Sequence, residues 1–167
     1  MNLKLLTILL VALDGSSTLT FVRRSPFHYE YKDIFYYFET FYKATWFKAF
    51  MSCSKMGMQL LSIDSDEEFD KIHEFLKDKI EYKPELSIWT SGAMKRIGQF
   101  NWINTGYPVR LSKWHPGEPN NYGGREYCLK IWINDNRFLL DDDRCDREMH
   151  FICESRKSSS DCIFYII

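Results

Sequence analysis

The sequence predicts an α+β domain, because two helical patterns come first and a series of short strand patterns follows them. Apolar residues recur at helical spacing within residues 46–56 and 65–80. After Pro84 the pattern changes to short apolar runs separated by Gly, Pro and Asn. The chain has 167 residues, of which 45% are hydrophobic and 17% aromatic. This length and composition predict one domain with a well-filled core.

Residues 1–20 predict a secretory signal peptide, with an early lysine, an apolar run from Leu5 to Leu13 and small polar residues before the expected cleavage between Ser16 and Thr20. The apolar run is too short to span a bilayer. A buried strand or helix of the domain is the alternative interpretation. Since no later segment is long and apolar enough for a membrane span, we expect a secreted, extracellular protein.

The first half of the domain predicts one strand and then a helix. Residues 34–39, IFYYFE, are almost entirely apolar or aromatic, which is typical of a strand buried on both faces. Trp46, Ala49, Phe50 and Cys53 follow at i, i+3, i+4 and i+7, so they share one face of a helix. Gly57 is a suitable residue for ending that helix.

A second helix is predicted to begin near Ser65. Ser65 and Glu68 fit a capping box, in which each side chain binds a backbone N–H at the start of the helix. Its buried stripe consists of four apolar residues, namely Phe69, Ile72, Leu76 and Ile80. Pro84 then bounds the helical region.

The second half of the domain predicts strands over residues 87–92, 99–103, 127–133 and 150–154. Between the second and third of these lies a segment rich in Gly, Pro and Asn, residues 104–125. A loop of this length inside a compact domain is uncommon and usually carries function.

The five cysteines are Cys53, Cys128, Cys145, Cys153 and Cys162. A secreted protein favours disulfides. Since five is an odd number, at least one cysteine stays free or pairs with another chain, and the sequence alone leaves the connectivity open.

An ordered series of motifs across residues 34–154 resembles the C-type lectin domain family, and most closely the small secreted single-domain lectins of insects. The series includes the helix residues Trp46, Ala49 and Cys53, then IWTSG, Phe100, Trp102, Gly106, Trp114, Glu118-Pro119-Asn120, Cys128, Cys145 and FICE. The resemblance implies a double-loop fold with two helices, small antiparallel sheets and a long ligand-binding loop. It places the domain at residues 27–155, followed by a tail at 156–167.

The same resemblance implies the disulfides Cys53–Cys153 and Cys128–Cys145. Cys162 has no counterpart in the basic domain. It is either free or joins two chains, which would make a homo-oligomer.

Calcium prefers six to eight oxygen ligands, with carboxylates and amide carbonyls among them. The resemblance implies that one calcium ion is bound by Glu118, Asn120, Glu126, Asp141 and Asp142. It also implies a cis Glu118–Pro119 bond. The alternative is that these are ordinary turn residues in a solvated acidic loop. The spacing of the acidic residues from two cysteines favours calcium.

In the resembling family the sugar binds the calcium directly, and Glu-Pro-Asn is associated with mannose-type sugars. This implies a carbohydrate site made of Glu118, Asn120, Glu126 and Asp141, with glycans of glycoproteins or cell surfaces as partners. Tyr122 lies in the same loop. Its ring either stacks on a sugar or is an exposed turn residue.

Asp141 departs from the family pattern, which has Trp-Asn-Asp where this chain has Leu140-Asp141-Asp142. Asparagine donates an N–H to the sugar, whereas a carboxylate only accepts. An unsatisfied partner costs about 1–3 kcal/mol. We therefore expect tighter calcium binding and weaker or re-oriented sugar binding. The alternative function is a C-type-lectin-like domain that binds a protein partner or calcium only.

The sequence offers little support for a second metal site, for catalysis or for nucleic-acid binding. Positions that hold a second calcium in relatives correspond to Ala93, Ile97, Asn121 and Tyr127, which predicts one calcium site. His73 lacks the second histidine of a zinc motif, and no nucleophile triad or phosphate loop is present, so we expect no enzymatic activity. The formal net charge of −1 gives no electrostatic reason to expect nucleic-acid binding.

Overall fold

A computed structural model of the chain describes residues 28–77, 86–134 and 137–156. The described elements are β1 (His28–Tyr31), β2 (Ile34–Ala44), α1 (Trp46–Lys55), β3 (Gln59–Leu60), α2 (Asp66–Lys77), β4 (Leu86–Arg96), β5 (Gln99–Trp102), a 3₁₀ turn η1 (Tyr122–Gly124), β6 (Cys128–Asn134), β7 (Arg137–Asp143) and β8 (Met149–Arg156). The prediction of an α+β domain is therefore confirmed. The expected signal peptide at 1–20, Ile80, and residues 157–167 of the expected tail, with Cys162, lie outside the described residues.

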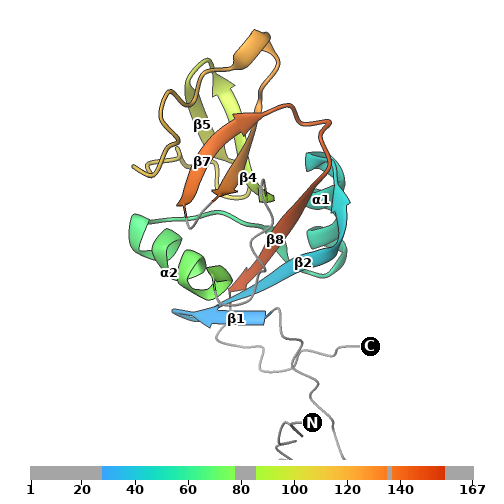
Figure 1. Cartoon of the computed structure of the whole chain (residues 1–167). Helices are drawn as coiled ribbons and strands as arrows, with labels where there is room; N and C mark the ends of the chain where they lie inside the picture. The colour runs from blue at the N-terminus through green and yellow to red at the C-terminus, as the bar shows by residue number, and fades with distance from the viewer. Residues whose placement is uncertain (1–27, 78–85, 135–136, 157–167) are drawn as a thin grey trace, which may run out of the picture.

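The strands form one mixed sheet in the order β1-β2-β8-β4-β6-β7, with β3 on β8 and β5 on β4. Antiparallel groups make up both halves of this sheet. They are joined by a single parallel pairing, in which Ile88 and Trp89 of β4 lie beside His150 and Phe151 of β8. Figure 1 shows α1 and α2 on either side of β8, with β4, β5 and β7 together in the upper part of the molecule.

Helix α1 buries the stripe that its spacing predicts. Ala49 and Cys53 are fully buried, and the rings of Trp46 and Phe50 stack with centroids 5.8 Å apart. The Trp46 indole N–H donates to the Thr90 carbonyl, which fixes the helix against β4. In the last turn of the helix, Cys53 forms a disulfide with Cys153, which joins α1 to β8.

Helix α2 begins with half of the predicted capping box. The Glu68 N–H donates to the Ser65 hydroxyl at 3.2 Å. The Glu68 carboxylate accepts from the Asp64 N–H rather than from that of Ser65, and it also accepts the Tyr36 hydroxyl at 2.6 Å. Glu68 thus connects the start of α2 to β2. Phe69, Ile72 and Leu76 are buried as predicted.

The expectation for residues 34–39 is right for one face of β2 only. Ile34, Tyr36 and Phe38 are buried in the larger core cluster. On the other face Phe35 and Tyr37 are half-buried, and Tyr37 packs at the margin of a second cluster around Trp89 and Phe151. Glu39, at the end of that face, is buried.

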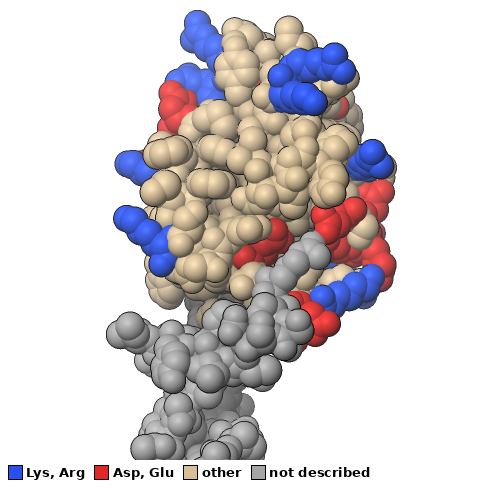
Figure 2. All heavy atoms as spheres, turned by 180° about the vertical axis from the view of Figure 1, so that it is seen from behind, with Lys and Arg blue, Asp and Glu red and all other residues tan. Residues whose placement is uncertain are grey.

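Charged side chains are dispersed on one face of the molecule. Figure 2 shows Lys and Arg separated around the rim of that face, with a largely uncharged centre. Among the described residues, no helix has the length and apolar character needed to cross a membrane.

Candidate functional site

The site is built on the β6–β7 hairpin, at the end of the strand order. The two strands pair antiparallel, with Lys130 opposite Asp141 and Leu129 opposite Asp142. The Cys128–Cys145 disulfide closes the base of this hairpin. Because β7 has a partner strand on one side only, its other edge is available to the loop that precedes β6.

The long loop uses that edge. The Leu140 N–H donates to the Lys113 carbonyl at 2.7 Å, and the His115 N–H donates to the Leu140 carbonyl at 2.8 Å. Trp114 and Leu140 therefore form a parallel bridge. This pairing brings the following loop residues alongside Asp141 and Asp142.

Asp142 then fixes the loop. Its side chain is 1% exposed, and its two carboxylate oxygens accept the N–H groups of Asn120 at 3.0 Å and Asn121 at 2.8 Å. A buried carboxylate requires such donors, and hydrogen bonds to a charged group are the stronger kind. The hairpin and the loop, which are more than twenty residues apart in sequence, are thereby held together.

Three of the predicted ligands have carboxylate oxygens within 4.8 Å of one another, namely those of Glu118, Asp141 and Asp142. Asn120 lies beside them, where its amide donates to Glu118 Oε1 at 2.7 Å. The Glu118–Pro119 bond is cis, as the resemblance implied. These oxygens are the hard ligands that calcium prefers, so the residues fit a calcium ion.

Glu126 does not join this group of three. Its carboxylate accepts the Tyr122 N–H at 2.9 Å, and its own N–H donates to the Asn121 side chain at 2.9 Å. Asn121 is left-handed, with φ of 46°. The two hydrogen bonds close the loop around η1, and this engages the Glu126 carboxylate within its own loop.

The crowding of carboxylates changes their protonation. Partial burial, the charge of Asp141 and the contact with Asp142 raise the pKa of Glu118 to about 7. Partial burial also raises the pKa of Glu126, against the lowering effect of the Tyr122 N–H. Calcium and protons therefore compete for these oxygens.

Lys130 is a residue of the site that the sequence motifs did not indicate. Its ammonium lies 2.6 Å from Asp143 Oδ2 and 3.1 Å from Asp141 Oδ2, and its side chain is 11% exposed. The expectation of tighter calcium binding through Asp141 leaves out this buried cation, which partly neutralises the Asp141 carboxylate. The available signal was a single lysine in the apolar run CLKIWI, in a strand that pairs with three consecutive aspartates.

Within the part of the chain that the structure describes, no other group of acidic, histidine or cysteine side chains lies close enough together to hold a metal ion. Tyr122 is 78% exposed, so its ring is accessible to a ligand. Of the positions that correspond to a second calcium site, Ile97 and Tyr127 are exposed hydrophobic residues and Asn121 is engaged with Glu126.

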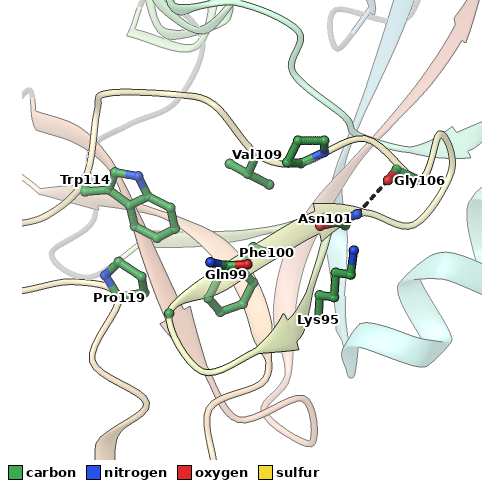
Figure 3. A pocket seen from close by; sticks show the side chains of 10 residues that line it. Lys95, Gln99, Phe100, Asn101, Gly106, Val109, Trp114 and Pro119 are labelled. Carbon is green, nitrogen blue, oxygen red and sulfur yellow. Dashed lines mark hydrogen bonds between the residues drawn. The ribbon is translucent and has the colours of Figure 1, made fainter.

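A hollow of about 500 Å³ lies on the flank of Pro119, between the β4–β5 hairpin and the long loop. Figure 3 shows Trp114 and Pro119 on one side of it and Asn101 and Lys95 on the other. The Asn101 side-chain amide donates a hydrogen bond to the Gly106 carbonyl at 2.6 Å. Residues of the long loop line part of the hollow, among them Trp114 and Pro119, but none of the predicted calcium ligands does.

Comparison with known proteins agrees with this architecture. The family model described as "Lectin C-type domain" matches residues 42–155. "Salivary C-type lectin 2" of Aedes albopictus is 31% identical over 119 residues, covering 68% of this chain and 79% of the relative. "C-type lectin 37Da" of Drosophila melanogaster is 30% identical over 129 residues, covering 71% of this chain and 66% of the relative.

Solved structures show the same fold. The mouse scavenger receptor C-type lectin carbohydrate-recognition domain superposes with a TM-score of 0.66 at 26% identity, covering 81% of this chain and 98% of that one. The C-type lectin domain of murine dendritic cell inhibitory receptor 2, in complex with N-glycan, superposes with a TM-score of 0.67 at 25% identity. The match covers 78% of this chain and 97% of that one. From its motifs, its fold and these matches, the chain belongs to the C-type lectin domain family.

Proposed function

We propose that this chain is a secreted, calcium-dependent lectin that binds the terminal sugar of a glycan. One observation carries the proposal, namely the approach of the Glu118, Asp141 and Asp142 carboxylates to within 4.8 Å of one another. Like charges this close repel, and a divalent cation relieves the repulsion. Membership of a family of carbohydrate-binding domains supports the sugar as the ligand.

The proposed ligand set for one calcium ion is Glu118, Asn120, Glu126, Asp141 and Asp142. When bound, the ion would coordinate two neighbouring hydroxyls of the sugar. The chain's own contribution is to hold the loop in place, through the Asp142 carboxylate and the edge of β7. The exposed ring of Tyr122 offers an apolar surface for the sugar face.

The proposed preference is for mannose-type sugars, with neighbouring equatorial hydroxyls. It rests on Glu118-Pro119-Asn120, by resemblance to the family. Secretion rests on the signal-like residues 1–20. A single shallow site binds one sugar weakly, so useful avidity needs several sites together. Members of the family are non-enzymatic, and we assign no catalytic activity to this chain.

The Lys130–Asp141 contact favours a second candidate function. Because the ammonium already occupies one oxygen of Asp141, the loop has an internal cation without calcium. A domain of this kind could recognise a protein partner with no sugar bound. Stabilisation of the chain by calcium without retention on any glycan would support this second function.

Retention on immobilised mannose and on immobilised galactose, followed by elution with a chelator, tests the proposal. We expect retention on mannose in calcium, release by the chelator and weaker retention on galactose. The matched control is Glu118→Gln, which keeps the size of the side chain and removes a ligand carboxylate. Retention that survives the chelator, or that Glu118→Gln leaves unchanged, would contradict a calcium-dependent site.

A further inference from the structure

Lys130 is a buried cation shared between the proposed metal site and the hairpin beneath it. It lies in β6, directly opposite Asp141 of β7. Its ammonium is 2.6 Å from Asp143 Oδ2 and 3.1 Å from Asp141 Oδ2, and the three side chains are 11%, 2% and 17% exposed. Asp141 belongs to the group of carboxylates that could hold a metal, whereas Asp143 does not.

This arrangement makes the ammonium a competitor for Asp141. One oxygen of that carboxylate is engaged with Lys130, which leaves the other for a metal ion. The positive charge also lies one carboxylate away from any divalent cation in the site, so it opposes that cation by Coulomb repulsion. Without a metal, the same charge offsets the repulsion among Glu118, Asp141 and Asp142.

We propose that Lys130 is an internal counter-cation of the calcium site, which keeps the acidic loop folded without metal and lowers its affinity for calcium. The inference rests on the proposed calcium site. It assigns to Lys130 a positioning role through Asp141, not a role as a ligand. Calcium affinity is then set by a residue outside the ligand set.

A purely structural ion pair predicts a different result. If Lys130 only stabilised the hairpin, its removal would disorder Asp141 and weaken both folding and calcium binding. A counter-cation predicts opposite signs, because its removal destabilises the metal-free protein and strengthens binding of calcium. The two quantities measured together therefore distinguish the roles.

The experiment uses the full chain and calcium alone as the probe. Isothermal titration gives the calcium affinity, and thermal unfolding in chelator and in calcium gives the stability of each state. We expect Lys130→Met and Lys130→Gln to bind calcium at least tenfold more tightly than the unsubstituted chain. We also expect a lower unfolding midpoint in chelator and a larger upward shift on adding calcium.

Two further variants serve as controls. Lys130→Arg keeps the charge, so its calcium affinity should stay within about threefold of the original. Lys71→Met removes an exposed lysine, paired with Glu74 on α2 at 2.8 Å, and should leave both calcium affinity and the calcium-induced shift unchanged.

Calcium affinity that is equal or weaker in both Lys130→Met and Lys130→Gln would overturn the inference. If these variants do not fold in chelator, the inference predicts that calcium restores the fold, and failure to fold in calcium overturns it. If the unsubstituted chain binds no calcium, the proposed function fails separately. In that case, calcium binding by Lys130→Met would still support the counter-cation. Absence of calcium binding in both the unsubstituted chain and Lys130→Met would refute it.

Discussion

Replacing Asp142 with asparagine should destabilise the metal-free chain, although it removes one charge from a crowded acidic site. Asp142 is 1% exposed and accepts the N–H groups of Asn120 and Asn121 at 3.0 and 2.8 Å. Hydrogen bonds to charged groups contribute about 1.5–3 kcal/mol each, and neutral ones about 0.5–1.5 kcal/mol. Asparagine keeps one acceptor oxygen, so one bond becomes neutral and the other is lost.

After allowance for relieved repulsion with Glu118 and Asp141, we expect a net loss of about 2 kcal/mol in the free energy of unfolding. The assay is urea unfolding in chelator at neutral pH, which separates the loss of the hydrogen bonds from the loss of calcium. The matched variant is Glu118→Gln. It removes the same charge from the same group and leaves both N–H groups on Asp142.

Glu118→Gln should leave the stability in chelator unchanged or higher, because the raised pKa of Glu118 means that the folded state disfavours its charged form. Asp142→Asn should therefore lower the stability in chelator and Glu118→Gln should not, while both variants lose calcium binding. If Asp142→Asn and Glu118→Gln have the same stability in chelator, Asp142 does not hold the loop as described.

Three other predictions concern the pH dependence of stability, the second disulfide and Tyr122. Because the pKa of Glu118 is raised to about 7 from an ordinary 4.5, its stabilising contribution is complete below pH 4.5 and is lost as pH rises through 7. In chelator, the unsubstituted chain should therefore lose stability relative to Glu118→Gln between pH 5 and pH 8, and parallel thermal curves would contradict this. Removing the Cys128–Cys145 disulfide, with a sequence separation of 17, should cost about 3 kcal/mol in urea unfolding on the chain-entropy model, and a loss below 1 kcal/mol would contradict it. Tyr122→Ala should reduce retention on mannose severalfold without changing calcium affinity, since the ring is 78% exposed, and unchanged retention would show that it does not contact the sugar.

Local patterns predict the helices of this fold well. The i, i+3, i+4, i+7 spacing from Trp46 identifies the buried face of α1, and Ser65 marks the start of α2. Each signal is contained within a short segment of the chain, so neither depends on tertiary contacts. Four of the five described strands after Pro84 are predicted for the same reason, although β4 extends to Arg96, well beyond its predicted end.

Local patterns miss β1, β3 and β7, and of these β7 carries the candidate site. Three consecutive aspartates are unfavourable for a strand by propensity. The strand forms in spite of these aspartates because Phe138 and Leu140 are buried in the core. Residues from other elements also provide hydrogen bonds and ion pairs to the aspartate carboxylates. Those partners come from β6 and from the long loop, and no period in the loop sequence predicts its pairing with Leu140.

The candidate ligands could be named from the sequence, but their balance of charge could not. The family resemblance names five ligands, and the structure brings three of their carboxylates together, those of Glu118, Asp141 and Asp142. The contact of Lys130 with Asp141 depends on the register of β6 against β7, which a single sequence leaves open. The sequence therefore overestimates the net negative charge of the site.

Thermal unfolding of the full chain, with and without calcium, tests most directly that this acidic loop is a metal site. The proposed site predicts that calcium raises the unfolding midpoint of the unsubstituted chain and does not raise that of Glu118→Gln, because a ligand that binds only the folded state stabilises it. An unchanged midpoint in the unsubstituted chain, or an equal rise in both proteins, would contradict the site.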